Sequence, residues 1–443
     1  MENFFSDNVI LSGSTSEKLY NEVKDLPIVD YHCHLSPKQI GENKVFTDIG
    51  EMWLSCDHYK WRAMRICNVD ERLITGEASY FEKFMAYAGI MPKLAGNALY
   101  YWTQLELKQI FGIVEPLSAA NGENIYKRCN EKLKNISVQN LLNKFKVEYI
   151  ASTDDPVDTL EYHGQYGNTT LAPTFRPDKV FLLDDEYFKK LSVASGIKIN
   201  SVDNLLSALE NRFDFFIKKG CKISDCGIGQ IPDFCNYSKA IKIFDKRNDG
   251  LTNIEREQMA GFLLIEIAKM AKKRDIVLQL HFSVIRNSNL SKLNEVGVDA
   301  GYDVMANEVS ADKLINFFNC LNTQNMLPKT ILYTLNPKVN ELICALSGSF
   351  PNVRVGAAWW FNDTLQGTKA HLQSVMEYAV LGEHLGMLTD SRSFASFVRH
   401  DFFRRILASE VANLVDRGEY DFNAAKTLMA NICYFNIKNF LKI

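Results

Sequence analysis

The sequence predicts an α/β fold: a distorted (β/α)8 TIM barrel with an α-helical insertion after the first strand. Three observations predict it: eight short β-rich runs, amphipathic segments between several of them, and a gap of roughly 110 residues after the first run. The chain has 443 residues, of which 47% are hydrophobic and 23% are charged. This composition suits a globular protein with a large core, and a single barrel with insertions accommodates the length.

The predicted strands have largely apolar bodies and mostly end in polar or aromatic residues. They span residues 27–34, 147–153, 171–176, 221–225, 275–281, 330–336, 353–360 and 385–390. Apolar residues at three- and four-residue steps predict helices at 204–219, 253–273, 311–322 and 367–383. Strands that alternate with helices in this way are typical of a parallel barrel.

The long gap predicts the insertion. It carries helix-like runs at 80–88 and 98–111 and few strand signals, whereas the short interval 153–171 has little helix signal and indicates a local distortion. No Pro/Gly/Ser-rich linker or internal repeat interrupts the chain, so we expect the insertion to pack against the barrel. The predicted units are an N-terminal segment with the first strand (1–34), the helical insertion (35–145), and the remaining barrel with C-terminal helices (146–443).

Charge and composition exclude several functional classes. Fifty Lys and Arg against 53 Asp and Glu give a net charge of −3, which argues against a nucleic-acid partner. No apolar run approaches the roughly 20 residues of a membrane helix, and the N-terminus lacks a signal-peptide pattern. Ten cysteines without regular spacing suggest buried thiols. We therefore expect a cytoplasmic protein without membrane or nucleic-acid partners; a homo-oligomer remains open.

The clearest chemical motif is His32-Cys33-His34, at the end of the first predicted strand. Side chains at positions i and i+2 of a strand share a face, and barrel active sites lie at the carboxyl ends of the strands. His281 and Asp390 end the fifth and eighth strands and complete a candidate site for one divalent metal ion, with zinc as first choice. Taken singly, the histidines also fit a polar loop or the core, and Asp390 fits a helix N-cap.

Arginines form a second group near the strand ends. Because a guanidinium binds a carboxylate through two hydrogen bonds, converging arginines favour an anionic substrate. The residues are Arg176, Arg286 and Arg392, and the alternative is that they pair with Asp154, Asp225 and Asp299. His58 and Tyr59 of the insertion lie within reach of the mouth, and Trp360 is either a pocket wall or core.

The motifs taken together resemble the uronate isomerase (glucuronate isomerase) family of the amidohydrolase superfamily. The resemblance runs in order from Asp30-Tyr-His-Cys-His-Leu-Ser-Pro37 to Phe402-Phe-Arg-Arg405. Matching segments between these ends are 57–65, 101–107, 153–156, 174–178, 279–281, 286–287, 358–363, 386–394 and 399–400. Cys226 departs from the family pattern, which has a histidine after the aspartate; Ala98, Tyr101 and 298–303 also differ.

The resemblance implies an aldose–ketose isomerase of hexuronate catabolism, whose partner is a small-molecule uronate. It would interconvert D-glucuronate with D-fructuronate, and D-galacturonate with D-tagaturonate, by moving a proton from C2 to C1 through an enediol. The resemblance also implies which residues act as the base, bind the metal, stabilise the enediolate, bind the substrate and form the pocket wall. They are Asp390 as base; His32, His34 and Asp390 on the metal, with His281 undecided; Tyr59 and Arg392 on the enediolate; His58, Arg176, Asp225 and Arg286 on the substrate; and Trp360 as the wall.

Two alternatives remain open. The first is a metal-dependent hydrolase of the same superfamily, in which Asp390 activates water instead of removing a proton from carbon. The second is a catalytically inactive protein that binds sugar acids or acts as a scaffold. Retention of both motif histidines and Asp390 argues against the second alternative.

Overall fold

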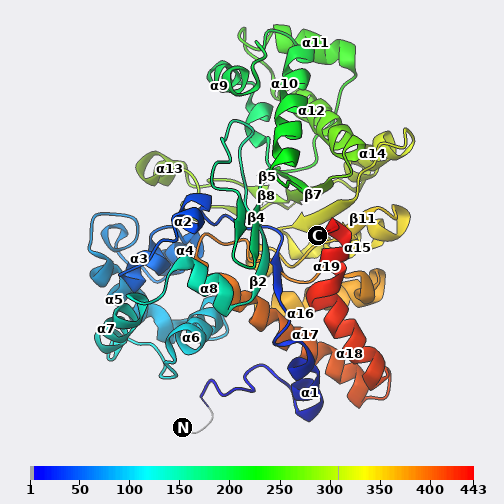
Figure 1. Cartoon of the computed structure of the whole chain (residues 1–443). Helices are drawn as coiled ribbons and strands as arrows, with labels where there is room; N and C mark the ends of the chain where they lie inside the picture. The colour runs from blue at the N-terminus through cyan, green and yellow to red at the C-terminus, as the bar shows by residue number, and fades with distance from the viewer. Residues whose placement is uncertain (1–3, 308) are drawn as a thin grey trace.

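The computed structural model describes residues 4–307 and 309–443 and has an α/β architecture of parallel sheets surrounded by helices (Figure 1). One sheet has the order β1-β2-β4-β3 and another the order β11-β10-β7-β6-β5. The first comprises β1 Ile28–Asp30, β2 Val147–Ala151, β4 Thr169–Ala172 and β3 Gly164–Tyr166; the second comprises β5 Thr174–Phe175, β6 Ile223–Gly227, β7 Val277–Phe282, β10 Thr330–Thr334 and β11 Val353–Val355. All pairs in these sheets are parallel except β3 with β4.

The two sheets meet where the predicted strand 171–176 is divided into β4 and β5 by Pro173. Proline has no N–H to donate and therefore interrupts a ladder. The chain after β2 continues alongside β5, because Asp154 N–H donates to Thr174 O at 3.1 Å and Arg176 N–H donates to Asp154 O at 3.0 Å. These bonds connect the chain that leaves β2 in the first sheet with β5, the edge strand of the second sheet.

The eighth predicted strand is wrong, because residues 385–390 form an extended segment without a ladder. Gly386 and Asp390 have φ values of +76° and +44°, which interrupt strand geometry. Single hydrogen bonds tie the segment to the chain after β1: Asp390 N–H donates to His32 O at 3.1 Å, and His34 N–H donates to Ser391 O at 2.9 Å. The predicted strands at 27–34 and 353–360 also end early.

The long gap after β1 is helical in the described chain. It contains α2 Pro37–Gly41, α3 Ile49–Leu54, α4 His58–Ile66, α5 Tyr80–Ile90, α6 Ala98–Phe111, α7 Gly122–Leu133 and α8 Val138–Lys144. A capping box formed by Ser79 and Glu82 starts α5, and Gly112 ends α6 with φ +61°. In place of a helix, the hairpin β3–β4 fills part of the interval 153–171.

The four helices predicted outside the insertion are present, and further helices lie before, between and after them. The four predicted ones are α10 Val202–Lys218, α12 Asn253–Lys273, α14 Ala311–Asn322 and α16 Leu365–Tyr378. The others are α1 Ser14–Val23, α9 Asp185–Ser195, α11 Tyr237–Asp245, α13 Leu290–Val296, α15 Asn340–Ser349, α17 Val398–Asp416, α18 Phe422–Ala430 and α19 Asn436–Leu441. A small hairpin pairs β8 Val284–Ile285 with β9 Val304–Met305. No described helix has the length and apolar character needed to cross a bilayer.

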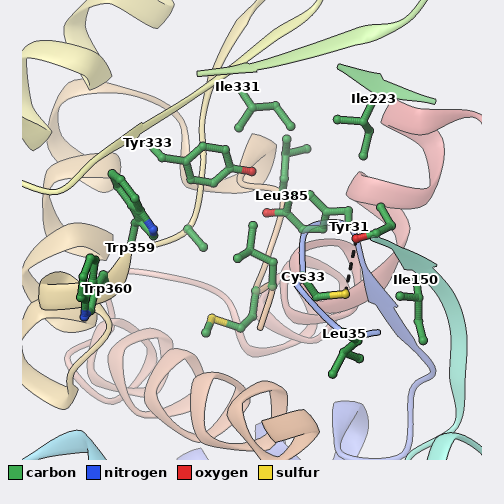
Figure 2. Close-up of a cluster of buried hydrophobic side chains, with 14 of the residues drawn as sticks. Tyr31, Cys33, Leu35, Ile150, Ile223, Ile331, Tyr333, Trp359, Trp360 and Leu385 are labelled. Atoms are coloured by element: carbon green, nitrogen blue, oxygen red, sulfur yellow. Dashed lines mark hydrogen bonds between the residues drawn. The ribbon is translucent and has the colours of Figure 1, made fainter. Parts of the chain in front are cut away.

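One connected core joins the two sheets. Figure 2 shows Ile150 of β2, Ile223 of β6 and Ile331 of β10 in a single buried cluster with Tyr31 and Leu385. Leu385 belongs to the segment without a ladder, so that segment is held by core packing as well as by its few hydrogen bonds.

Candidate active site

A cavity of about 440 Å³ lies where the chain leaves the carboxyl ends of the strands. Nine of the predicted site residues line it: His32, His34, His58, Arg176, His281, Arg286, Trp360, Asp390 and Arg392. Tyr59 and Asp225 are not among the lining residues, so the structure places both behind the wall. A site at this end of parallel strands agrees with the general rule for α/β folds.

Two histidines and one carboxylate oxygen converge in this cavity. Asp390 Oδ1 lies 3.2 Å from His32 Nε2 and 3.1 Å from His34 Nε2. Ligand atoms around a tetrahedral Zn²⁺ at 2.0–2.1 Å are about 3.3 Å apart, so the spacing fits a shared metal ion. His32, His34 and Asp390 therefore form a group suited to hold a metal.

His281 lies beside this group but is bound to Asp225. Its Nδ1 is 2.7 Å from Asp225 Oδ1, and its ring stacks on Tyr333 with 4.2 Å between centroids. The His281 Nε2 atom and the Nδ1 atom of His32 are buried without hydrogen-bond partners among the described residues. Buried polar nitrogens are usually satisfied, so the His281 Nε2 atom fits a site completed by a metal, water or substrate, whereas His32 Nδ1 lies 3.9 Å from Asp225 Oδ2.

Asp390 is held through its second oxygen as well. The indole N–H of Trp359 donates to Asp390 Oδ2 at 2.8 Å. Burial raises the pKa of Asp390, but hydrogen bonds from His32 and His34 outweigh it and hold that pKa well below its usual value. The residue is therefore an ionised carboxylate, as a metal ligand or a base requires.

Asp225, which is fully buried behind the cavity wall, forms an ion pair with Arg176, which lines the cavity. Arg176 Nη1 lies 3.0 Å from Asp225 Oδ2, and its Nε donates to Asp178 Oδ2 at 2.8 Å. Burial opposes ionisation of Asp225, yet Arg176, His281 and His32 together lower its pKa below the usual range. Asp225 thus orients Arg176 and His281 by charge.

Arg286 and Arg392 are also paired with carboxylates. Arg286 Nη1 donates to Asp303 Oδ2 at 2.8 Å, and Arg392 Nη2 donates to Asp299 Oδ2 at 3.1 Å. The predicted alternative of ion pairs therefore holds for Asp225 and Asp299. Asp154 instead lies 3.3 Å from His163. Because the arginines line the cavity as well, the two interpretations coexist.

The first turn of α4 supplies His58 and Tyr59. Asp57 caps this helix, accepting from Tyr59 N–H at 3.0 Å. Burial, and then Arg392, lowers the pKa of His58 to about 4, so this imidazole is neutral at pH 7. Its ring lies 4.8 Å from that of Trp360, whereas the Tyr59 hydroxyl is buried without a partner among the described residues.

Sequence reasoning missed three contributions to the site. Trp359 receives no role from the sequence, although its indole contacts Asp390 and Figure 2 shows it beside Trp360. Asp178 and Asp303 were not assigned, although each binds a cavity arginine. The position of Asp178, two residues after Arg176, is a signal that was available; nothing local marks Asp303.

Comparisons with known proteins give consistent matches along nearly the whole chain. The model of a family described as glucuronate isomerase matches residues 1–441. A protein of Caldicellulosiruptor bescii named uronate isomerase is 40% identical over 99% of both chains. The crystal structure of uronate isomerase from Thermotoga maritima has a TM-score of 0.96 at 35% identity and covers 99% of both chains. That of glucuronate isomerase from Caulobacter crescentus has a TM-score of 0.93 at 26% identity, covering 99% of this chain and 97% of its own.

Proposed function

The chain belongs to the glucuronate isomerase family and is an aldose–ketose isomerase of uronates, and we propose that it interconverts D-glucuronate with D-fructuronate and D-galacturonate with D-tagaturonate. The observation that carries this proposal is the convergence of Asp390 Oδ1 with His32 Nε2 and His34 Nε2 in a cavity that also carries three arginines. The cavity volume of about 440 Å³ is within the range of small-molecule sites.

The architecture we propose is a distorted (β/α)8 barrel. Its eighth position would be taken by residues 385–390, which lie beside the chain after β1 without a ladder. The units would be residues 1–34, a helical insertion at 35–145, and the rest of the barrel at 146–443. Helices α2 to α8, all between β1 and β2, support this division.

The cofactor we propose is one divalent metal ion, with zinc as first choice. His32, His34 and Asp390 would hold it, and the free Nε2 of His281 is the candidate for a further contact. When bound, such an ion polarises the oxygens on C1 and C2 of the sugar. Two imidazoles with one carboxylate suit zinc, although other borderline cations share this preference.

Asp390 is proposed as the base. Aldose–ketose isomerisation moves one proton from C2 to C1 and a second proton from the C2 hydroxyl to the C1 oxygen, and one carboxylate beside both carbons serves both halves of the first transfer. The ionised state of Asp390 and its anchor on Trp359 support this role. Arg392 and the unpartnered Tyr59 hydroxyl are the candidates to stabilise the enediolate, although Tyr59 must act from behind the cavity lining.

Substrate contacts are proposed for His58, Arg176 and Arg286, with Trp360 as a wall. A neutral His58 can donate a hydrogen bond to a sugar hydroxyl or accept one from it, and a guanidinium binds the C6 carboxylate. Asp225 supports Arg176 and His281 from behind. All ten cysteines are free thiols in the structure, which supports a proposed reducing, cytoplasmic location.

The test is an assay of the purified, zinc-loaded protein with D-glucuronate and with D-galacturonate. The proposal predicts a ketose product from at least one of them, detected by NMR. No ketose from either substrate would overturn it, and hydrolysis of an amide or ester substrate in place of isomerisation would favour the hydrolase alternative.

A further inference from the structure

We propose that Asp30 and Arg399 are positioning residues that hold the main chain of Thr389 and thereby set the place of Asp390. The inference rests on the proposed role of Asp390 as base and metal ligand. Its starting point is that residues 385–390 lack a ladder, so ordinary strand pairing does not place Asp390. In addition, Asp390 has φ +44°, an unfavourable backbone conformation for a residue other than glycine.

Asp30 binds the 385–390 segment from the β1 side, where no ladder holds it. It is the last residue of β1 and is fully buried. Its Oδ1 accepts from Thr389 N–H at 2.8 Å, and its Oδ2 accepts from the Thr389 hydroxyl at 2.6 Å. Both carboxylate oxygens are thus bound by the residue that precedes Asp390.

Arg399 holds the same residue from the other side. It lies on α17, is 1% exposed, and donates from Nη1 to Thr389 O at 2.7 Å. Its guanidinium lies 3.9 Å from the centroid of the Trp102 ring, which fixes its plane, and its Nη1 is 3.8 Å from Asp363 Oδ2. The N–H, hydroxyl and carbonyl of Thr389 are therefore all bound by two buried charged side chains.

These contacts connect the base to the histidine motif. Asp30 lies two residues before His32, and Thr389 lies one residue before Asp390. The hydrogen bonds of Asp30 and Arg399 to Thr389, here called the clamp, therefore fix the end of β1 and the 385–390 segment against each other. They keep His32 Nε2 at 3.2 Å from Asp390 Oδ1. Charged hydrogen bonds are strong and directional, which suits a segment that must hold a strained residue in place.

The chain offers a matched control on the same helix. Arg404 of α17 is also buried, at 4% exposure, and its guanidinium donates to Lys24 O at 3.1 Å and Pro27 O at 2.9 Å. It therefore makes the same kind of bond as Arg399, but to carbonyls before β1. Loss of either arginine removes buried hydrogen bonds, and only loss of Arg399 releases Thr389.

The experiment compares Arg399→Lys, Asp30→Asn and the control Arg404→Lys in the zinc-loaded protein, and measures kcat, KM and the melting temperature. Because displacement of a reacting group by about 1 Å costs on the order of 100-fold in rate, we expect kcat to fall about 10- to 100-fold in the first two variants, with KM changed less than about threefold. Arg404→Lys should lower the melting temperature to a similar extent while keeping kcat within about twofold of the native chain. If the three variants had the same kcat, whether native or reduced, the inference would be overturned.

A second pair keeps the inference falsifiable if Asp30→Asn does not fold. Thr389→Ser retains the hydroxyl, and Thr389→Val removes it at nearly the same volume. With Co²⁺ in place of zinc, the visible absorption spectrum reports the ligand geometry directly. We expect a changed spectrum and a lower kcat for Thr389→Val and a native spectrum for Thr389→Ser; native values for both would contradict the clamp. An inactive native chain would instead defeat the proposed function.

Discussion

Trp359 donates its indole N–H to Oδ2 of Asp390 at 2.8 Å, while Oδ1 of the same carboxylate lies against the Nε2 atoms of His32 and His34. The two oxygens therefore have different partners. Trp359 fixes the rotation of the carboxylate and leaves Oδ1 to the histidines. A base that must reach two neighbouring carbons of a sugar benefits from such a fixed plane.

Replacing Trp359 by phenylalanine tests this relationship. The change keeps an aromatic ring but removes a hydrogen bond to a charged group, which contributes about 1.5–3 kcal/mol. We expect kcat for uronate isomerisation to fall about 10- to 100-fold. The control is Trp61→Phe, which loses an indole hydrogen bond of the same length, 2.8 Å, to Leu54 O and none to Asp390. A native kcat in Trp359→Phe would show that this bond does not orient the base.

Arg286 and Arg176 differ in side-chain exposure and in the number of carboxylates of the protein that they bind. The side chain of Arg286 is 37% exposed and has Asp303 as its carboxylate partner, whereas that of Arg176 is 19% exposed and binds both Asp178 and Asp225. We expect Arg286→Lys to raise KM for uronates about tenfold with little change in kcat, because lysine does not bind a carboxylate bidentately. Arg176→Lys should lower kcat as well, since it disturbs His281 through Asp225. Steady-state kinetics of both variants distinguish these outcomes; an unchanged KM in Arg286→Lys would exclude it as the carboxylate-binding residue.

The buried pair His371 and His384 predicts a dependence of stability on pH. Their Nε2 atoms are 3.2 Å apart, and burial lowers the pKa of His371 to about 4 and that of His384 to about 3. In the unfolded chain both pKa values are about 6.5, so below that pH the unfolded state binds more protons than the folded state. The contribution of the pair is therefore complete above pH 6.5 and is lost progressively as the pH falls toward 3.

Melting temperatures of the native chain and of His384→Asn between pH 7.5 and pH 4.5 check this prediction. The variant removes one of the two titrating groups and should be less stable than the native chain at pH 7.5, with a shallower loss on acidification. Parallel curves for the two proteins would rule out the pair as a source of the acid sensitivity.

Removal of the metal tests the cofactor. Elemental analysis should find one divalent ion per chain, and a chelator should abolish isomerisation until Zn²⁺ is restored. His34→Gln removes a proposed ligand whose Nε2 is 3.1 Å from Asp390, and it should weaken metal binding by more than the roughly 10- to 100-fold that loss of a partner behind a ligand costs. Full activity in a metal-free preparation would remove the metal from the mechanism.

The sequence predicts the helices better than the strands, for identifiable reasons. The bounds of α6, α12 and α14 follow from it to the residue, because apolar periodicity coincides with caps at Asn97, Thr252 and Ser310. The segment 385–390 reads as a strand by composition, yet positive φ at Gly386 and Asp390 prevents a ladder. An aspartate carries no local sign that its backbone will be left-handed.

The candidate site was predictable where residues follow strand ends, and not where partners depend on folding at a distance. His32, His34 and His281 meet because they lie in or directly after parallel strands, whereas Asp390 comes from a segment that is hydrogen-bonded to the chain after β1 without a ladder. That Arg286 would pair with Asp303, and that Asp154 would lie against His163, depends on how the segments 286–303 and 154–163 turn back. The burial of the Tyr59 hydroxyl likewise depends on how distant segments pack around it and could not be predicted from the residues nearby.

The most direct measurement of the central claim follows deuterium from C2 of labelled D-glucuronate through one turnover in ordinary water. If Asp390 moves a single proton within the cavity, NMR should find part of the deuterium at C1 of the ketose. Asp390→Asn should form ketose on the order of 100- to 10,000-fold more slowly, the range that general-base catalysis contributes. A ketose without deuterium at C1, or a native rate in Asp390→Asn, would contradict the assignment of Asp390 as the proton-transferring base.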